Sequence, residues 1–506
     1  MQTMNGQHVL ILGLGECGYA MARWCARCGA RVTVADTRED PPKLAALLEA
    51  VPAARFVPGA FSAALLDGDG VHAVYRSPGL SPAEVAPVVS AAVAHGIQAS
   101  GELGLFAQAL AHLREERDYR PVLLAVTGTN GKTTVTALTG LLVQRGGKTV
   151  AVAGNISPSL LDALTDRLES DALPQAWVIE LSSFQLDAAG AFEATAAAML
   201  NLTQDHLDWH GSMEAYAAAK ARVFGTGALM VLNREDPLVM QMLPPPAKVK
   251  GGRMEQRAYV TFGADMPQRP GDFGIEQVNG MDWLVRALES DETQRRRKDT
   301  AAEELHFQRL MPADALRIRG RHNAVNALSA LALGTAAGCP LGPMLYGLRE
   351  YRGEPHRVEA VGVVNGVEYF NDSKGTNVGA TVAALQGLGV ERRLVVILGG
   401  DGKGQDFSPL AQPVARYARA VVLIGRDAPR IQAALEGAGV PLMKAQSMHE
   451  AVATAASAAR HGDAVLMSPA CASFDMFRNY PHRAEVFREA VRALAEEAGL
   501  ELEAGA

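Results

Sequence analysis

The stretch from Val122 to Thr134, VLLAVTGTNGKTT, constrains the fold of this chain more than any other. An apolar run typical of a buried strand leads into a glycine turn, and Gly131 and Lys132 then begin a helix. Backbone N–H groups at such a helix start bind phosphate oxygens, and a lysine in the first turn opposes the helix dipole unless an anion lies beside it. The pattern predicts a phosphate-binding loop and the use of ATP. A tight turn without a ligand is the alternative.

This loop is shorter than the usual P-loop. The position five residues before Gly131, which is normally glycine, is Val126, and the motif that remains is GxxGKT from Gly128 to Thr133. The chemistry does not need the longer loop, because Lys132 supplies a cation for the terminal phosphates and the Thr133 hydroxyl can ligate Mg²⁺.

Length and composition favour an enzyme of several domains that stays in the cytoplasm. A chain of 506 residues is too long for one hydrophobic core, so two to four domains are expected. The net charge of -7 argues against nucleic acid, and no apolar run is long enough to predict a membrane span or a signal peptide. Five cysteines do not suggest a disulfide framework. Cys25 and Cys28 form a CxxC without a second pair, so we expect them to pack in a core.

Hydrophobic strands alternate with alanine-rich helical stretches along the whole chain, which predicts an α/β fold with parallel sheets. The pattern separates into three blocks, which we place at residues 1–115, 116–352 and 353–506. A long polar insertion, at about residues 245–312, interrupts the second block. Its basic run at residues 295–298 is most simply a solvated loop.

The first block carries a GxGxxG motif directly after a strand. Gly13, Gly15 and Gly18 form the motif, and Asp36 ends the next strand. This spacing is typical of dinucleotide binding and by itself suggests NAD. The same geometry suits any nucleotide diphosphate, so a UDP-sugar fits equally well, and a structural glycine turn remains open.

Two further clusters follow the phosphate loop. Glu180 ends the strand WVIE, at the edge where parallel sheets bind ligands, and is therefore a candidate Mg²⁺ ligand. The run NLTQDHLDWH places His206 and His210 four residues apart. They could share a zinc ion on a helix, although the neighbouring Asp and Asn residues suit a harder cation. A structural histidine is the alternative for His206.

The motifs TGTNGKTT, ELSSFQL, LNLTQDHLDWH, YAAAKARVF and RGRHNAVNALSALAL resemble, in order and spacing, the ATP-dependent Mur ligases that build the peptide of bacterial cell-wall precursors. In the third block, HRVE, FNDSKGTN, LGGDGKGQDFSPL and MSPACASFDMF resemble the branch that adds D-glutamate to UDP-N-acetylmuramoyl-L-alanine. The resemblance covers nearly the whole chain except the segment after Pro244.

The resemblance implies three domains: a Rossmann-like N-terminal domain for the UDP-sugar, a central P-loop-type ATPase domain with a mostly parallel sheet, and a Rossmann-like C-terminal domain for the amino acid. It implies an acyl-phosphate intermediate, release of ADP and phosphate, and two Mg²⁺ sites in which Mn²⁺ can substitute. Because no long exposed heptad pattern suggests an oligomer, we expect a monomer. The resemblance also implies that the third domain closes when ATP binds.

Site residues follow from the resemblance position by position. The catalytic set is Lys132, Glu180, His206 and Lys220; the metal ligands are Thr133, Glu180, His206 and Lys220, the last as a carbamate formed with CO₂. From pattern alone, a surface lysine on a helix is the alternative for Lys220. The residues expected to bind ATP are Gly128, Thr129, Asn130, Gly131, Lys132, Thr133, Thr134, Asn323, Asn326, Arg357 and Asp372. The residues expected to bind the UDP-sugar are Gly15, Glu16, Cys17, Asp36, Thr37, Arg38, Ser77, Pro78, Gly79 and Asn155. The residues expected to bind D-glutamate are Lys374, Thr376, Lys403, Ser473 and Phe474, with Tyr480 beside them.

Glu16 departs from the family pattern, because a carboxylate beside a diphosphate is repulsive unless it turns outward and offers only its backbone N–H. Four rival functions stay open. They are a sibling ligase, a folylpolyglutamate-type ligase, an NAD-dependent oxidoreductase and a nucleotide-gated binding protein.

Overall fold

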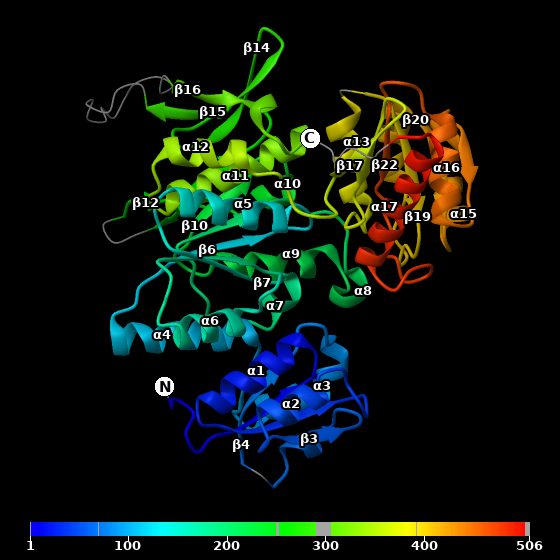
Figure 1. Ribbon diagram of the computed structural model, residues 1–506. Coiled ribbons are helices and arrows are strands. Elements are labelled where there is room, and N and C mark those ends of the chain that lie inside the picture. Colours follow the sequence, from blue (N-terminus) through cyan, green and yellow to red (C-terminus); the bar gives the residue numbers. More distant parts are fainter. Residues whose placement is uncertain (1, 69, 249–251, 290–304, 391, 501–506) are drawn as a thin grey trace. The chain divides into compact units, whose positions relative to one another are not determined.

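The computed structural model describes residues 2–68, 70–248, 252–289, 305–390 and 392–500. The chain divides into two compact units, each described here by itself. The first comprises Met1–Leu202, His206–Thr261 and Ser329–Tyr346, and the second comprises Thr203–Asp205, Phe262–Leu328 and Gly347–Ala506. Sheets of mostly parallel strands with flanking helices make up both units (Figure 1), which confirms the predicted α/β class. The domain boundaries 1–115, 116–352 and 353–506 stay predictions.

The N-terminal sheet is fully parallel, with the order β3-β2-β1-β4-β5. Its central strand reads HVLIL without alternation because helices cover both faces. Val9 and Ile11 share a core with α1 and α4, whereas Leu10 and Leu12 face α3. The elements are β1 (His8–Leu12), α1 (Glu16–Arg27), β2 (Arg31–Asp36), α2 (Leu44–Ala50), β3 (Arg55–Pro58), β4 (Val71–Arg76), α3 (Pro82–Ala94), β5 (Gln98–Ser100) and α4 (Glu102–Arg117).

The central sheet of the first unit has the order β13-β10-β9-β6-β8-β7. Because β7, β8, β6 and β9 are parallel neighbours, the loops that follow them lie at one edge of the sheet. Its elements are β6 (Val122–Thr127), α5 (Lys132–Arg145), β7 (Val150–Gly154), α6 (Leu160–Glu169), β8 (Ala176–Glu180), α7 (Ser183–Asp187), β9 (Ala196–Met199), α8 (Leu207–His210), α9 (Met213–Ala221), β10 (Leu229–Asn233), α10 (Pro237–Met240) and β13 (Tyr259–Phe262). Helices α11 (Arg321–Ala336) and α12 (Leu341–Glu350) follow later in the chain.

Much of the predicted polar insertion is folded into strands. Three of them, β14 (Phe273–Val278), β15 (Met281–Glu289) and β16 (Leu305–Pro312), pair antiparallel, and the short β11 (Ala247–Lys248) and β12 (Met254–Glu255) form a separate pair. Leu284, Val285 and Ala287 bury their side chains and anchor β15. The charge of the segment concealed this apolar pattern. The basic run at 295–298 lies outside the described residues.

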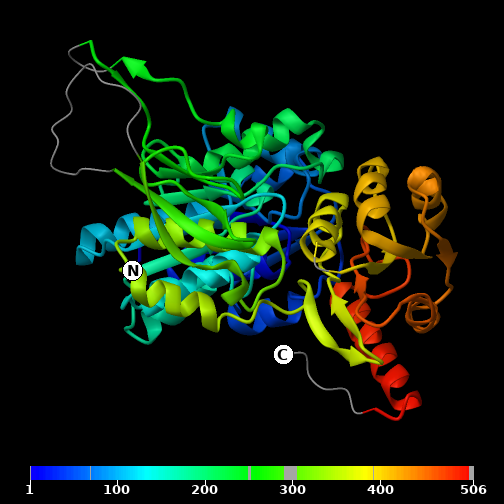
Figure 2. The same ribbon diagram turned by 90° about the horizontal axis from the view of Figure 1, so that it is seen from above.

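The C-terminal sheet has the order β17-β18-β22-β19-β20-β21, and only β17 runs antiparallel to its neighbour. Val396 and Leu398 pack on α13, α14 and α15, while Val395 and Ile397 pack on α16 and α17, so helices cover both faces (Figures 1 and 2). The elements are β17 (Glu359–Val364), β18 (Val367–Asn371), α13 (Val378–Gly389), β19 (Leu394–Gly399), α14 (Ala411–Tyr417), β20 (Ala418–Ile424), α15 (Ala428–Leu435), β21 (Leu442–Lys444), α16 (Met448–Ala458), β22 (Ala464–Met467) and α17 (Tyr480–Glu497).

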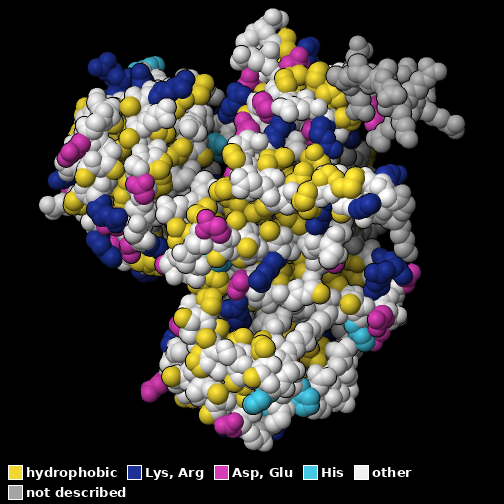
Figure 3. Space-filling model, turned by 180° about the vertical axis from the view of Figure 1, so that it is seen from behind, with side chains coloured by type: hydrophobic (Ala, Val, Ile, Leu, Met, Phe, Trp, Pro, Cys, Tyr) yellow, Lys and Arg dark blue, Asp and Glu magenta, His cyan; other side chains and the backbone are white. Residues whose placement is uncertain are grey.

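The surface carries mixed charges (Figure 3), and the two cysteines of the CxxC are buried. Acidic and basic side chains are interspersed on the face seen in Figure 3. Within the described part of the chain, no helix has both the length and the apolar character that a membrane span requires. Cys25 and Cys28 are buried in the core around α1 and carry free thiols, which confirms that this CxxC serves packing.

Candidate active site

The predicted phosphate-binding loop leaves β6 and enters α5 at the edge of the central sheet. Gly131 precedes the first turn of α5 with φ 84°, a conformation that favours glycine. A side chain at Gly128 would place its Cβ 2.9 Å from Cβ of Leu200, so glycine also allows the loop to approach the segment after β9. Glycine is therefore required at Gly131 by the backbone conformation and at Gly128 by the close approach of Leu200.

Asn201, which follows β9, holds this loop in shape. Its Oδ1 accepts a hydrogen bond from the backbone N–H of Asn130 (2.8 Å), and its Nδ2 donates to the backbone oxygen of the same residue (3.1 Å). The backbone oxygen of Asn201 also accepts from the N–H of Thr129 (2.8 Å). The sequence marked Asn201 only as part of a polar cluster, because its partner lies 71 residues away.

Lys132 folds back over the loop. Its Nζ donates to the carbonyl oxygens of Gly128 (3.1 Å) and Thr129 (2.8 Å). Thr133 and Thr134 follow it in the first turn of α5. The predicted ATP residues from Gly128 to Thr134 thus form one continuous turn around a lysine cation, which is the charge that phosphate binding requires.

Glu180 has an oxygen without a partner. The side chain is 2% exposed; Oε1 accepts from Nδ2 of Asn155 (2.9 Å), while Oε2 is buried without a hydrogen-bond partner among the described residues. A buried carboxylate oxygen left unsatisfied is costly. This orphaned atom, beside a phosphate-type loop, is of the hard-oxygen kind that Mg²⁺ prefers, so the residue fits its predicted role.

Lys220 is a buried cation. Its side chain is 1% exposed, and Nζ donates to the carbonyl oxygen of Gly128 (2.6 Å) and to Oγ1 of Thr127 (3.3 Å). The ring of Tyr216 lies 4.9 Å from the same nitrogen. The predicted surface alternative for Lys220 is wrong, because α9 turns this side chain into the core, against the phosphate loop.

His206 precedes the short helix α8, His210 is its last residue, and both rings lie against Phe184. Their ring centroids are 4.7 and 5.7 Å from that of Phe184. Nε2 of His210 lies 2.9 Å from Oγ of Ser183, and burial lowers the pKa of His210 to about 4, so its ring is neutral. Among the described residues no group of three or more His, Cys, Asp and Glu side chains is placed to hold a metal ion.

The glycine turn of the N-terminal sheet is tightly built. A Cβ on Gly18 would lie 1.9 Å from the backbone oxygen of Gly13, so only glycine fits there. Oγ of Ser77 donates to that same oxygen (2.9 Å) and joins the predicted segment Ser77, Pro78 and Gly79 to the turn. Gly15 precedes α1 with open space around it.

Asp36 organises the same turn. Its Oδ2 accepts from the N–H of Leu14 (2.7 Å), and both oxygens accept from the guanidinium of Arg38 (2.8 Å each). The hydrogen bonds from Arg38 dominate and lower the pKa of Asp36 to about 2. Thr37 lies between them in the sequence. The Glu16 carboxylate turns outward and pairs with Lys43 (2.8 Å), which meets the condition set for its predicted contact.

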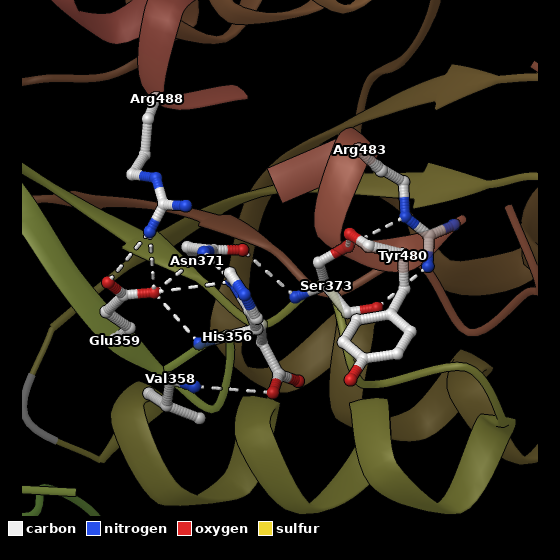
Figure 4. A network of polar contacts seen from close by, with 9 residues as sticks. His356, Val358, Glu359, Asn371, Ser373, Tyr480, Arg483 and Arg488 are labelled. Carbon is white, nitrogen blue, oxygen red and sulfur yellow. Dashed lines mark hydrogen bonds and ion pairs between the residues drawn. The ribbon is translucent and has the colours of Figure 1, made fainter. Parts of the chain in front are cut away.

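In the second unit, Arg483 joins the two loops that carry the predicted glutamate residues (Figure 4). It is 1% exposed; its guanidinium donates to Oγ (3.0 Å) and the backbone oxygen (2.8 Å) of Ser373 and to the backbone oxygen of Cys471 (3.1 Å). Sequence reasoning missed Arg483. The available signal was a charged residue on the otherwise apolar face of α17.

The predicted glutamate residues lie on those two loops and on the loop after β19. Ser473 is buried, whereas Phe474 is 70% exposed, so Phe474 does not belong to the core. Nζ of Lys374 lies 4.0 Å from the ring centroid of Tyr480. Lys403 adopts φ 48°, and Thr376 donates its backbone N–H to the oxygen of Lys374.

Asp372 and a histidine network lie beside these loops. Asp372 is buried and accepts from Oγ of Ser468 (2.6 Å); burial raises its pKa to about 7. Glu359 accepts from the side chains of Asn371 (2.8 Å) and Arg488 (3.1 Å), near His356 (Figure 4). Arg357 follows His356. Elsewhere in this unit, Asn326 Nδ2 donates to Oδ1 of Asn323 (3.1 Å) on α11.

Comparisons with known proteins agree on one class. Three family models match successive parts of the chain: the Mur ligase MurD-like N-terminal domain over residues 7–101, the Mur ligase middle domain over 126–334 and the Mur ligase glutamate ligase domain over 356–471. A relative from Albidiferax ferrireducens is 69% identical over 506 residues and covers all of both chains. The chain therefore belongs to the Mur ligase family and is a ligase, which decides against the NAD-dependent oxidoreductase.

That relative is a UDP-N-acetylmuramoylalanine–D-glutamate ligase, and so is a relative from Polaromonas sp., 57% identical over 99% of this chain and 100% of its own. Solved structures share the fold. A UDP-N-acetylmuramate–alanine ligase of Thermotoga maritima (20% identity, 96% of this chain and 99% of that one) has a TM-score of 0.53. The MurF ligase of Thermotoga maritima in complex with ADP (14% identity, 98% and 96%) has a TM-score of 0.55. These likenesses confirm the predicted fold class.

Proposed function

We propose that this chain uses ATP to join D-glutamate to UDP-N-acetylmuramoyl-L-alanine during the synthesis of the bacterial cell-wall precursor. The observation that carries the proposal is the shaped phosphate loop with two buried ionisable side chains, Glu180 and Lys220, beside it. It stands in a chain that is 69% identical over its full length to a D-glutamate ligase.

The reaction has two steps. A carboxylate oxygen of the L-alanyl group attacks the terminal phosphorus of ATP, which forms an acyl phosphate and releases ADP. The amine of D-glutamate then attacks the acyl carbon, phosphate leaves, and an amide remains. The sibling and folylpolyglutamate-type rivals would share these steps and differ in their substrates.

The first step brings anions together. Two unit charges 4 Å apart repel by about 4 kcal/mol at an effective dielectric of 20, so fixed cations have to be in place beforehand. Lys132 supplies one, within a turn of backbone N–H groups at the start of α5. Asn201 keeps that turn in shape by accepting hydrogen bonds from the N–H groups of Thr129 and Asn130.

Metal ions supply the remaining charge neutralisation when bound. Thr133 and Glu180 would hold one Mg²⁺, with the free Oε2 of Glu180 as the ligand atom. His206 and Lys220 belong to the second site. An ammonium cannot ligate a cation, so Lys220 takes part as a carbamate, which presents oxygen atoms.

The remaining loops are assigned to the other substrates. The α1 turn with Asp36 and Arg38 receives the UDP group, and Asn155 faces the sugar-peptide portion. In the second unit, Lys374 and Lys403 pair with the two carboxylates of D-glutamate, while Thr376 and Ser473 offer hydroxyls. Asn323, Asn326, Arg357 and Asp372 are assigned to the nucleotide.

Free thiols on all five cysteines agree with a reducing cytoplasm, where we place a monomeric enzyme.

Phosphate release tests the proposal. The purified chain receives ATP, Mg²⁺ and UDP-N-acetylmuramoyl-L-alanine with D-glutamate, L-glutamate, meso-diaminopimelate or L-lysine in separate reactions. We expect turnover with D-glutamate alone. Turnover with another amino acid would point to a sibling ligase, and ATP consumption without any amino acid would favour a nucleotide-gated binding protein. A Lys132→Ala variant with unchanged turnover would remove the phosphate loop from the mechanism.

A further inference from the structure

Glu102 is a buried carboxylate that the proposed mechanism does not use. It begins α4, is 2% exposed, and its Oε1 accepts a hydrogen bond from the backbone N–H of Leu161 (3.1 Å) in the first turn of α6. Its Oε2 is also buried, and no nitrogen or oxygen donor among the described residues bonds to it. Burial raises the pKa of the Glu102 carboxyl, and the hydrogen bond from Leu161 acts in the opposite direction. A negative charge in this position is costly unless the surroundings stabilise it.

Three helices begin around this carboxylate. Cys17 is the second residue of α1, Glu102 the first of α4, and Leu161 the second of α6; the three helices pack against one another. Helices α1 and α6 run in the same direction, as two ion pairs show: Arg23 with Asp162 (3.2 Å) and Arg27 with Glu169 (2.5 Å). Each helix start carries about half a positive charge, so the three starts repel one another and a negative charge between them stabilises the arrangement.

The thiol of Cys17 faces the same carboxylate. Burial raises its pKa, and the charge and hydrogen bonding of Glu102 raise it further, so the thiol keeps its proton. A protonated S–H is a weak donor. The Cys17 thiol and the Ser159 hydroxyl both lie beside the Glu102 carboxyl and lower its pKa by hydrogen bonding.

The segments joined here both carry predicted substrate contacts. The α1 turn from Gly15 to Cys17 is assigned to the UDP group, and the segment just before α6 carries Asn155, assigned to the sugar-peptide portion. We propose that Glu102 is a positioning residue for the UDP-sugar substrate, which fixes the α1 turn relative to the Asn155 segment through Cys17 and the start of α6. The inference rests on the proposed function and adds a residue to its substrate site.

A ligand that spans both segments should sense Glu102, and one that touches only the α1 turn should not. Glu102→Gln keeps an oxygen for Leu161 but removes the charge. We expect its KM for UDP-N-acetylmuramoyl-L-alanine to rise about tenfold, with kcat and the KM values for ATP and D-glutamate within about twofold of the parent. Calorimetric titration with UDP alone should give a Kd within about twofold. Glu169→Gln, which removes the exposed carboxylate that pairs with Arg27 between α1 and α6, is the matched control and should leave all constants unchanged.

The thiol provides a second, milder test should Glu102→Gln fail to fold. Cys17→Ala removes the donor and should raise the same KM about threefold, and Cys17→Ser should restore it. An unchanged KM in Cys17→Ala, an equal weakening of UDP and of the full substrate, or a loss of kcat with all KM values unchanged would overturn the inference. If the parent chain does not bind UDP at all, the proposed function fails instead.

Discussion

The Nζ atom of Lys220 lies 2.6 Å from the carbonyl oxygen of Gly128, in the loop that begins the phosphate site. As an amine, Lys220 therefore braces the loop from inside the core. As a carbamate it would give up this donation and present oxygen atoms in the same place. Both states can be measured.

The first prediction concerns this lysine. Lys220→Arg keeps a positive charge but cannot react with CO₂, so we expect kcat to fall by about a hundredfold or more. The intact parent chain, measured by native mass spectrometry, should carry the added mass of one CO₂, and its turnover should fall in buffer purged of bicarbonate. Full activity from a chain whose Lys220 is a bare amine would rule the modification out.

Glu180 is expected to set the metal requirement. Glu180→Gln keeps an oxygen for Asn155 and removes the charge at the unpartnered Oε2, so the Mg²⁺ concentration for half-maximal turnover should rise at least about tenfold. Calorimetric titration with Mn²⁺ provides a reading independent of activity. Glu116→Gln, on the surface of α4, is the control and should behave as the parent. Equal Mn²⁺ binding by Glu180→Gln and the parent would contradict the assignment.

Arg483 is expected to affect both stability and the amino-acid site. Arg483→Met leaves the oxygens of Ser373 and Cys471 without their donor, so the free energy of unfolding should fall by about 3 kcal/mol. The KM for D-glutamate should rise more than that for ATP, because both joined loops carry its predicted contacts. Arg488→Met, on the same helix but half exposed, should cost less than about 1 kcal/mol. Equal losses in thermal unfolding of the two variants would refute this.

His322 should make stability depend on pH. Burial lowers its pKa from 6.5 to about 4. Between these values the unfolded chain binds a proton that the folded chain does not, so stability is fully present above about pH 6.5 and declines as the pH falls towards 4. His322→Met cannot titrate. The difference between the melting temperatures of parent and variant should therefore shrink from pH 7 to pH 4, and parallel curves would exclude the effect.

Much of the proposed site could be predicted because its residues sit in continuous motifs. The loop Gly128–Thr133, Glu180 at the end of β8 and Asp36 at the end of β2 all follow apolar strands, and short-range pattern is enough to place them. Glu102 and Arg483 could not be predicted in this way. Their partners lie 59 and 110 residues away in the sequence, and the apolar helix face around Arg483 does not indicate which groups it contacts.

The strands of the polar insertion were missed for a related reason. In β15 the buried residues Leu284, Val285 and Ala287 do not alternate strictly, since the pairing with β16 shifts register between Leu284 and Val285. A period-two pattern is therefore broken among the buried residues of this strand. Lys220 was misjudged from pattern alone as well, because an alanine-rich helix does not reveal which face it buries.

The three hydrogen bonds between Asn201 and the turn at Thr129 and Asn130 have a thermodynamic consequence. A loop that is already rigid loses little conformational entropy when a ligand arrives, so that loss subtracts little from the binding free energy. We therefore expect nucleotide binding at this turn to require little reshaping of its backbone.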